Sequence, residues 1–295
     1  MNVYLQSVIL GIVEGLTEFL PVSSTAHLRI TEAAMHISLD DAYWKMYSIV
    51  IQAGAILALL LLYLARIVEF LRTFPRGEDG DRRWWNHPLS LTIAAFIATA
   101  IPALALKKWS DHNLGSITVM SLSLLIGGIV MWVIDVWASR TEPSTTHVEQ
   151  MGFGQALWIG LCQSLAAILP GVSRSMSTIA SGQIVGLDRP AALEFSFLLS
   201  IPTMLAATGY DLLKSIHPGK AALTSSLAPV AAPVTMTGER WLVLAIGFFV
   251  SFLVALGVVE WFLHWVRRHG FTVFAIYRIV VGIALLLYGS RFLAS

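Results

Sequence analysis

Long apolar stretches alternate with short polar or charged segments along the whole chain. A helix that crosses a bilayer needs about 20 predominantly apolar residues, because it must span a hydrocarbon core of about 30 Å. Six stretches meet this requirement, so the pattern predicts an all-α polytopic membrane protein with six transmembrane helices. The predicted transmembrane helices cover residues 44–65, 88–106, 117–137, 191–213, 240–265 and 271–292.

Two further apolar stretches are interrupted by a proline, at Pro21 and Pro170. The limb before Pro21 has roughly 17 residues and would be about 25 Å long as a helix, which is short for a span. Polar residues follow each proline, and proline breaks a helix. We therefore interpret the limbs 4–20 and 26–35, and the stretch 153–186, as two re-entrant helical hairpins. The alternative for the first is an ordinary span with an amphipathic tail.

The second half of the chain repeats the pattern of the first. The run from Gly160 to Pro170 lies over the run from Gly11 to Pro21 at a constant spacing of 149 residues. Each half contains one hairpin and three crossings, and an odd number of crossings inverts the second half, so the hairpin tips can meet near the midplane. The sequence thus predicts one integral membrane domain, 1–295, with an inverted-topology repeat over 1–137 and 153–295 and a polar linker over 138–152.

Composition agrees with a membrane protein and excludes several other classes. Hydrophobic residues make up 56% of the chain and charged residues 13%, whereas soluble domains carry about 25% charged residues. The net charge of +1, without a basic run, argues against a nucleic-acid partner. Cys162 is the only cysteine, which excludes an intrachain disulfide and a thiolate metal cage. Five arginines in the loop 66–87 favour a cytoplasmic position for that loop.

Glu14 and Glu18 are unusual within the apolar first hairpin. At a spacing of four residues their carboxylates lie on one face of a helix, and burying them costs several kcal/mol each unless they are paired. Ionisable residues at membrane depth are functional candidates, whereas the same pair on a soluble helix would mark a solvated face. Hydroxyl and imidazole groups follow the proline directly, at Ser23, Ser24, Thr25 and His27.

The second hairpin carries different side chains at the same positions. Gln163 and Ala167 replace the two glutamates, so the acidic pair belongs to the first half alone. The run after the second proline is typical of an anion cradle. Gly171 permits a tight turn, Ser173 can cap a helix whose N–H groups point at a ligand, and Arg174 can bind phosphate oxygens with two N–H groups.

Together these groups favour metal-assisted phosphoryl transfer. Glu14 and Glu18 can hold Mg²⁺ or Ca²⁺, which prefer oxygen ligands, and the metal and Arg174 would neutralise phosphoryl charge. His27 is placed to act as general base or acid, although a lone histidine is often structural. Ser24 could be the nucleophile, and a metal-bound water would serve equally well. The expected phosphate-binding residues are Ser23, Thr25, Gln52, Ser173, Ser175 and Thr178.

Two runs of residues resemble the signature motifs of the undecaprenyl-diphosphate phosphatase family of the bacitracin-resistance type. These runs extend from Glu14 to His27 and from Pro170 to Thr178, and further similar runs lie at 51–56, 194–202 and 274–278. Ala26 and Met176 depart from the family pattern, which usually has glycine there. A β-carbon at either position would narrow the pocket or limit the turn.

The resemblance implies an enzyme of the bacterial inner membrane, with a pocket open to the periplasm, that removes the terminal phosphate of undecaprenyl diphosphate. This reaction recycles the lipid carrier for cell-wall synthesis and confers resistance to bacitracin. The resemblance also implies a divalent metal, a homodimer and catalytic roles for Glu14, Glu18, Ser24, His27 and Arg174. The alternative is a transporter or flippase of a phosphorylated polyprenyl lipid, because inverted repeats with broken helices are typical of transporters.

Overall fold

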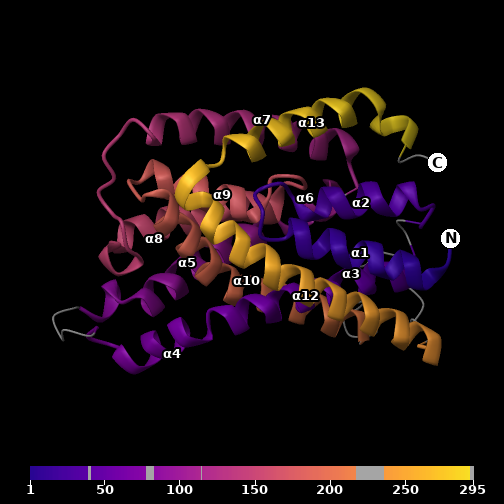
Figure 1. The fold of residues 1–295 in the computed structure, drawn as a ribbon, viewed down its shortest axis with the longest axis horizontal. Coiled ribbons are helices and arrows are strands. Elements are labelled where there is room, and N and C mark those ends of the chain that lie inside the picture. Colours follow the sequence, from indigo (N-terminus) through magenta and orange to yellow (C-terminus); the bar gives the residue numbers. More distant parts are fainter. Residues whose placement is uncertain (39–40, 78–82, 114, 217–235, 293–295) are drawn as a thin grey trace.

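The computed structural model describes residues 1–38, 41–77, 83–113, 115–216 and 236–292, and the regular elements within these ranges are all helices (Figure 1). Six of them are long and apolar enough to cross a membrane, which confirms the predicted all-α architecture and identifies a multi-pass membrane protein. They are α3 (Ala42–Leu62), α5 (Pro88–Ala105), α7 (Ile117–Ala138), α10 (Arg189–Ile216), α12 (Gly238–His269) and α13 (Thr272–Phe292).

Polar side chains fix where several of these helices begin. Asp41 accepts hydrogen bonds from the backbone N–H groups of Tyr43 and Trp44 at the start of α3. Ser116 and Thr237 cap α7 and α12 in the same way. Each cap satisfies an N–H group that has no partner within the helix.

One charged segment that we expected to be a loop begins as a helix. α4 (Leu64–Thr73) occupies the first part of the loop predicted over 66–87. Arg66 and Glu69 form an ion pair within α4, while Phe70 is buried. The loop prediction was wrong there because oppositely charged residues three apart support a helix, and the Arg66 guanidinium also lies over the ring of the buried Phe70, 4.6 Å from its centroid.

Shorter helices complete the connections between the spans. The polar linker predicted over 138–152 holds only a single 3₁₀ turn, and residues 78–82 of the charged loop lie outside the described residues. The short helices are η1 (Trp84–Asn86), α6 (Lys107–Asn113) and η2 (Val148–Gln150).

Two pairs of helices lie where the hairpins were predicted. α1 (Val3–Thr17) and α2 (Ser24–Ala34) form the first hairpin, and α8 (Phe153–Ile168) and α9 (Arg174–Ile184) form the second. In Figure 1 the two hairpins approach each other from opposite ends of the molecule.

A glutamine near the start of each hairpin binds the backbone at its end. Gln6 Nε2 donates to the carbonyl oxygen of Met35 at 3.4 Å, and Gln155 Nε2 donates to that of Val185 at 2.8 Å. Each chain segment therefore returns to the level at which it started. The depth of the hairpins in a bilayer and the inverted orientation of the two halves stay predictions.

The turns at the two hairpin tips meet in the middle of the molecule. We name residues 18–23 the first tip and residues 169–173 the second tip. Ser175, just after the second tip, donates from Oγ to the carbonyl oxygen of Leu20 in the first tip at 2.9 Å. Glycine is required at Gly171, because φ is +93° there and a β-carbon would lie 2.5 Å from a backbone oxygen.

Arg278 of α13 joins the two tips. Its side chain is fully buried, and its guanidinium donates to the carbonyl oxygens of Pro21 in the first tip and Gly171 in the second, at 3.2 and 3.1 Å. A third bond, of 3.2 Å, reaches the carbonyl oxygen of Ser123 in α7. Non-helical backbone is tolerated at membrane depth only where protein satisfies its polar groups, and Arg278 supplies that satisfaction to both tips.

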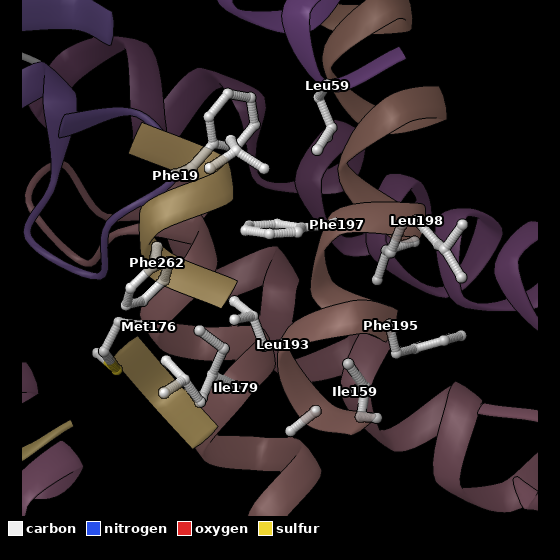
Figure 2. Close-up of a cluster of buried hydrophobic side chains, with 14 of the residues drawn as sticks. Phe19, Leu59, Ile159, Met176, Ile179, Leu193, Phe195, Phe197, Leu198 and Phe262 are labelled. Carbon is white, nitrogen blue, oxygen red and sulfur yellow. The ribbon is translucent and has the colours of Figure 1, made fainter. Parts of the chain in front are cut away.

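An apolar cluster holds the first tip from another side. Phe19, next to Glu18, is fully buried and meets Phe197 of α10 edge to face, with ring centroids 5.6 Å apart. Figure 2 shows Phe19 and Phe197 pointing into the same cluster as Leu59 of α3. Packing against two transmembrane helices therefore limits the movement of the backbone that carries Glu18.

Small residues let the first hairpin lie close against α12. A β-carbon at Gly11 would lie 2.8 Å from the carbonyl oxygen of Gly247, and one at Gly15 would lie 2.7 Å from that of Ser251. Two glycines four residues apart commonly form such a contact surface between membrane helices. Because Gly15 follows Glu14 directly, this contact also helps to set the position of that carboxylate.

Asp135, near the end of α7, connects three other helices. Its carboxylate accepts hydrogen bonds from Arg189 Nε at 2.7 Å, from Gln183 Nε2 at 3.3 Å and from the backbone N–H of Phe271 at 3.0 Å. Asp135 is 1% exposed. The ends of α7 and α9 and the starts of α10 and α13 therefore share one buried carboxylate.

We expect Asp135→Ala to lower the free energy of unfolding by about 2–3 kcal/mol, because the buried donors that face it lose their acceptor. Thermal unfolding of the detergent-solubilised protein, followed by tryptophan fluorescence, would measure the change. Glu142→Ala is the matched control, since Glu142 is exposed and lies close in sequence. Equal unfolding temperatures for the two variants would contradict the connecting role of Asp135.

Candidate active site

Glu18 and Arg174 come from opposite hairpins and form an ion pair. Arg174 Nη2 lies 3.5 Å from Glu18 Oε1, and the two side chains are 13% and 5% exposed. Attraction between opposite charges strengthens where water is excluded, and burying either group alone would be costly. The predicted meeting of the acidic half and the basic half of the site is confirmed at these two residues.

Arg174 has donors that its protein neighbours do not use. Nε and Nη2 are buried without a hydrogen-bond acceptor among the described residues, and Nη1 lies 3.5 Å from the carbonyl oxygen of Ser196. Arg174 begins α9, and Ser173 caps this helix by accepting a hydrogen bond from the N–H of Met176, as predicted. A guanidinium beside a helix N-terminus is an arrangement that suits an anionic ligand.

Ser24 is hydrogen-bonded to the same carboxylate that faces Arg174. Its Oγ donates to Glu18 Oε2 at 2.6 Å, which is the short distance typical of a hydroxyl bound to a carboxylate. Glu18 therefore contacts a hydroxyl with one oxygen and a guanidinium with the other. Chemically, this arrangement can remove a proton from Ser24 while it holds an anion beside it.

Glu14 is a buried carboxylate without a hydrogen bond. It is 1% exposed, and neither of its oxygens has a donor within the described part of the chain. The backbone N–H of Glu18 donates to the carbonyl oxygen of Glu14 at 2.9 Å, so the two acidic residues lie one helical turn apart. Such a group is costly unless a cation accompanies it, and two carboxylates with substrate phosphates and waters are a usual ligand set for Mg²⁺. The residues present therefore fit a divalent cation at Glu14 and Glu18.

Among the residues that the structure describes, no larger metal-binding cluster accompanies this pair. Within the described ranges, no three His, Cys, Asp or Glu side chains lie together as a metal site would require. Hydroxyls, waters or substrate oxygens would have to complete the ligand set of a cation held by Glu14 and Glu18.

Two pockets meet at the start of α2, directly after the first tip. One has a volume of about 320 Å³ and includes Glu14, and the other has a volume of about 220 Å³ and includes Glu18 and Arg174. We name them the outer pocket and the inner pocket. The three residues that line both are Ser24, Thr25 and Gln52.

The walls of the two pockets differ in character. The outer pocket carries charged side chains, and the inner pocket combines the polar residues of both tips with an apolar wall. The further charged residues of the outer pocket are Arg29, Glu32 and Lys45. The inner pocket includes Ser23 and Ser173, and its apolar wall is formed by Ala166, Ala167, Met204 and Ala207.

Gln163 is an inner-pocket residue to which the sequence analysis gave no role. Its Nε2 donates to Thr99 Oγ1 at 2.9 Å and to Thr203 Oγ1 at 3.1 Å. Both threonine hydroxyls donate to backbone carbonyl groups, so they can only accept from Gln163, and this fixes which end of the amide is the oxygen. Oε1 is left buried without a partner among the described residues. Its alignment with Glu14 was the signal that could have identified it.

His27 lies on a different side of α2 from the pocket residues. It lines neither pocket. Its Nδ1 is 2.8 Å from the carbonyl oxygen of Ser23, and its Nε2 is 2.7 Å from the hydroxyl of Tyr277. The structure therefore does not bring His27 together with Ser24 Oγ as a general base would require. The tyrosine was not identified from sequence, although it lies in the similar run 274–278.

Two of the expected phosphate-binding hydroxyls bind protein groups instead. Ser175 donates to the first tip, and Thr178 Oγ1 lies 2.6 Å from Ser196 Oγ. Neither lines the outer or the inner pocket. They hold the tips and α9 in place rather than face the space between Glu18 and Arg174.

The two positions that depart from the family pattern do not narrow the pockets. Ala26 is fully buried against Met120 and Leu124, and Met176 lies in the main apolar cluster. A β-carbon at Gly127 would lie 2.7 Å from the Met176 methyl carbon, which shows that a small residue there makes room for this side chain.

Comparison with known proteins agrees with the geometry of the site. The chain matches the family model of the bacitracin resistance protein BacA over residues 7–284. It is 56% identical to an undecaprenyl-diphosphatase of Koribacter versatilis over 292 residues, 99% of this chain and 100% of that relative. It is 44% identical to one of Novosphingobium aromaticivorans over 96% of each chain, and 39% identical to one of Aquifex aeolicus over 98% of each chain. The chain therefore belongs to the bacitracin resistance protein BacA family.

Proposed function

We propose that this protein hydrolyses undecaprenyl diphosphate to undecaprenyl phosphate and inorganic phosphate. The observation that carries the proposal is that Glu18 contacts both a hydroxyl, at Ser24, and a guanidinium, at Arg174, between the two tips. This is what transfer of a phosphoryl group needs: an activated oxygen next to a cation that binds the group. The relatives named undecaprenyl-diphosphatase support this choice of substrate.

Arg174 and the N-terminus of α9 would bind the terminal phosphate. The guanidinium can donate two parallel N–H groups to phosphate oxygens, and Ser173 and Thr25 border the same space. Gln163 Oε1 could accept a hydrogen bond from a protonated phosphate oxygen or from water. The apolar wall of the inner pocket would receive the first isoprene units of the lipid.

Ser24 is the proposed nucleophile. As its Oγ attacks the terminal phosphorus, its proton passes to Glu18, the bond to the bridging oxygen breaks, and undecaprenyl phosphate leaves. Water then attacks phosphorus, the bond from phosphorus to Ser24 Oγ breaks, and Glu18 returns its proton to that oxygen. Both hydrogens of the water leave with the inorganic phosphate. Direct attack by water remains the alternative route, with Glu18 as the proton acceptor and Ser24 as a hydrogen-bonding group.

Glu14 and Glu18 would hold a divalent cation, Mg²⁺ or Ca²⁺. When bound, the cation supplies positive charge for the diphosphate oxygens. The same charge removes the cost of burying Glu14 without a hydrogen-bond donor. Glu14 therefore serves the cation in this proposal, whereas Glu18 serves both the cation and the proton of Ser24.

The proposed location is the bacterial inner membrane, with the outer pocket open to the periplasm. The arginines of the loop 66–87 favour the cytoplasm for that loop. Ser38 and Lys45 line the outer pocket at the opposite end of α3. In this orientation the enzyme recycles the lipid carrier of cell-wall synthesis and confers bacitracin resistance. The homodimer stays a prediction.

We expect Glu18→Gln and Arg174→Ala each to lower phosphate release from undecaprenyl diphosphate by at least about 100-fold, because each removes a group that stabilises the transition state. Released inorganic phosphate would be measured with detergent-solubilised protein and Mg²⁺ or Ca²⁺. Glu142→Gln and Arg140→Ala, which change exposed residues outside the spans, are the matched controls. Full activity in the two site variants would contradict the proposal, and lipid transfer across vesicles without phosphate release would favour the flippase.

We expect Glu14→Gln to raise the divalent cation concentration for half-maximal activity by about tenfold or more, because one of two charged ligands is lost. A cation titration of phosphate release, with Glu32→Gln as the matched change in the outer pocket, would measure it. An unchanged requirement in Glu14→Gln would remove Glu14 from the cation site.

A further inference from the structure

Both nitrogens of His27 are engaged, and the partners determine which one carries hydrogen. The carbonyl oxygen of Ser23, 2.8 Å from Nδ1, can only accept, so Nδ1 is the N–H of the neutral ring. Nε2 then has a lone pair and accepts a hydrogen bond from the hydroxyl of Tyr277, 2.7 Å away. The two rings are stacked, with centroids 5.5 Å apart and planes 15° from parallel. The basic nitrogen of His27 is therefore turned toward α13 and is already occupied.

Ser23 is a residue whose backbone needs such support. Its φ of +76° lies in the left-handed region, which non-glycine residues rarely adopt. Ser23 also makes no side-chain cap to α2. Its carbonyl oxygen accepts from the backbone N–H of His27 at 3.3 Å as well as from the imidazole.

The second hairpin has a similar backbone conformation before its second helix but a different supporting contact. Ser173 directly precedes α9 as Ser23 directly precedes α2, and its φ is +61°, but its hydroxyl caps α9 by accepting from the N–H of Met176. The fourth residue of α2 is His27, whereas the fourth residue of α9 is Ser177, which has no ring that could reach another helix. The ring contact with α13 is thus special to the hairpin that carries Glu18 and Ser24.

Tyr277 and Arg278 are consecutive on α13 and hold carbonyl groups two residues apart in the first tip. Arg278 binds the carbonyl oxygen of Pro21 directly, and Tyr277 reaches that of Ser23 through His27. Ser23 is followed directly by Ser24, whose Oγ lies 2.6 Å from Glu18 Oε2. A displacement of the Ser23 carbonyl would rotate the first turn of α2 and move Ser24 Oγ.

We infer that Tyr277 is a positioning residue for the reaction: its hydroxyl orients His27, and His27 holds the Ser23 carbonyl so that Ser24 Oγ stays against Glu18. The inference rests on the proposed function. In this inference His27 positions Ser24 for the reaction. Glu18, and not His27, accepts the proton of Ser24. Misplacing a reacting group by about 1 Å can cost about 100-fold in rate.

The test separates support from proton transfer by the choice of variants. Asparagine can place an N–H donor near the position of His Nδ1, but it cannot act as a base. We expect His27→Asn to keep kcat within about tenfold of the parent and His27→Ala to lower it by about 100-fold, with KM little changed in both. His27→Asn as inactive as His27→Ala would overturn the inference.

Removal of one hydroxyl tests Tyr277 itself. We expect Tyr277→Phe to lower kcat by about tenfold at unchanged KM in the parent, and to have no further effect in the His27→Ala background, because its action passes through the imidazole. Tyr288→Phe, an exposed tyrosine on the same helix, is the matched control. A Tyr277→Phe variant with full turnover, or one whose effect persists without His27, would overturn the inference.

A spectroscopic measurement makes the inference testable without turnover. In the detergent-solubilised parent, imidazole ¹⁵N shifts of His27, assigned by comparison with His27→Ala, should show a neutral ring with the hydrogen on Nδ1. Tyr277→Phe should shift the Nε2 resonance, because its hydrogen-bond donor is lost. A hydrogen on Nε2 in the parent would overturn the inference. If the parent protein releases no phosphate from undecaprenyl diphosphate, that result would instead count against the proposed function.

Discussion

Opposite charges that face each other inside an apolar protein are the constraint on which the rest of this structure depends. A lone carboxylate or guanidinium at membrane depth is costly, and so is backbone whose polar groups have no partner. Bringing the two tips together solves both problems, because Arg174 faces Glu18 and Arg278 binds carbonyl groups of both tips. Neither hairpin satisfies its polar groups alone, so the two halves complete each other.

The two hairpins share a backbone design but supply different chemistry. The first contributes Glu14, Glu18 and Ser24, and the second contributes a guanidinium at the start of a helix. In a transporter built from repeats, the two halves exchange roles, whereas here the charges are divided between them. This division favours a fixed site for one reaction. The aromatic contact of Tyr277 with His27 extends the division, since it supports only the hairpin that carries the proposed nucleophile.

The sequence predicted the spans and the charged pair because both depend on patterns within short segments. Long apolar runs give the helices, and the repeated proline places Glu18 in the first tip and Arg174 directly after the second. The partner of His27 could not be predicted, because Tyr277 lies 250 residues away and only packing of α13 brings it near. The sequence also could not show which hydroxyl groups line a pocket. Thr25 and Thr178 have the same side chain, but Thr25 lines the inner pocket, whereas Thr178 Oγ1 is hydrogen-bonded to Ser196.

A structure determined in a lipid bilayer with orthovanadate and Mg²⁺ would test the central claim most directly, since vanadate takes the geometry of a transferring phosphoryl group. The account predicts vanadate between the tips, in contact with Ser24 Oγ and the Arg174 guanidinium, with Glu18 within about 4 Å of Arg174. Vanadate bound elsewhere, or Glu18 and Arg174 separated into different compartments, would contradict the account.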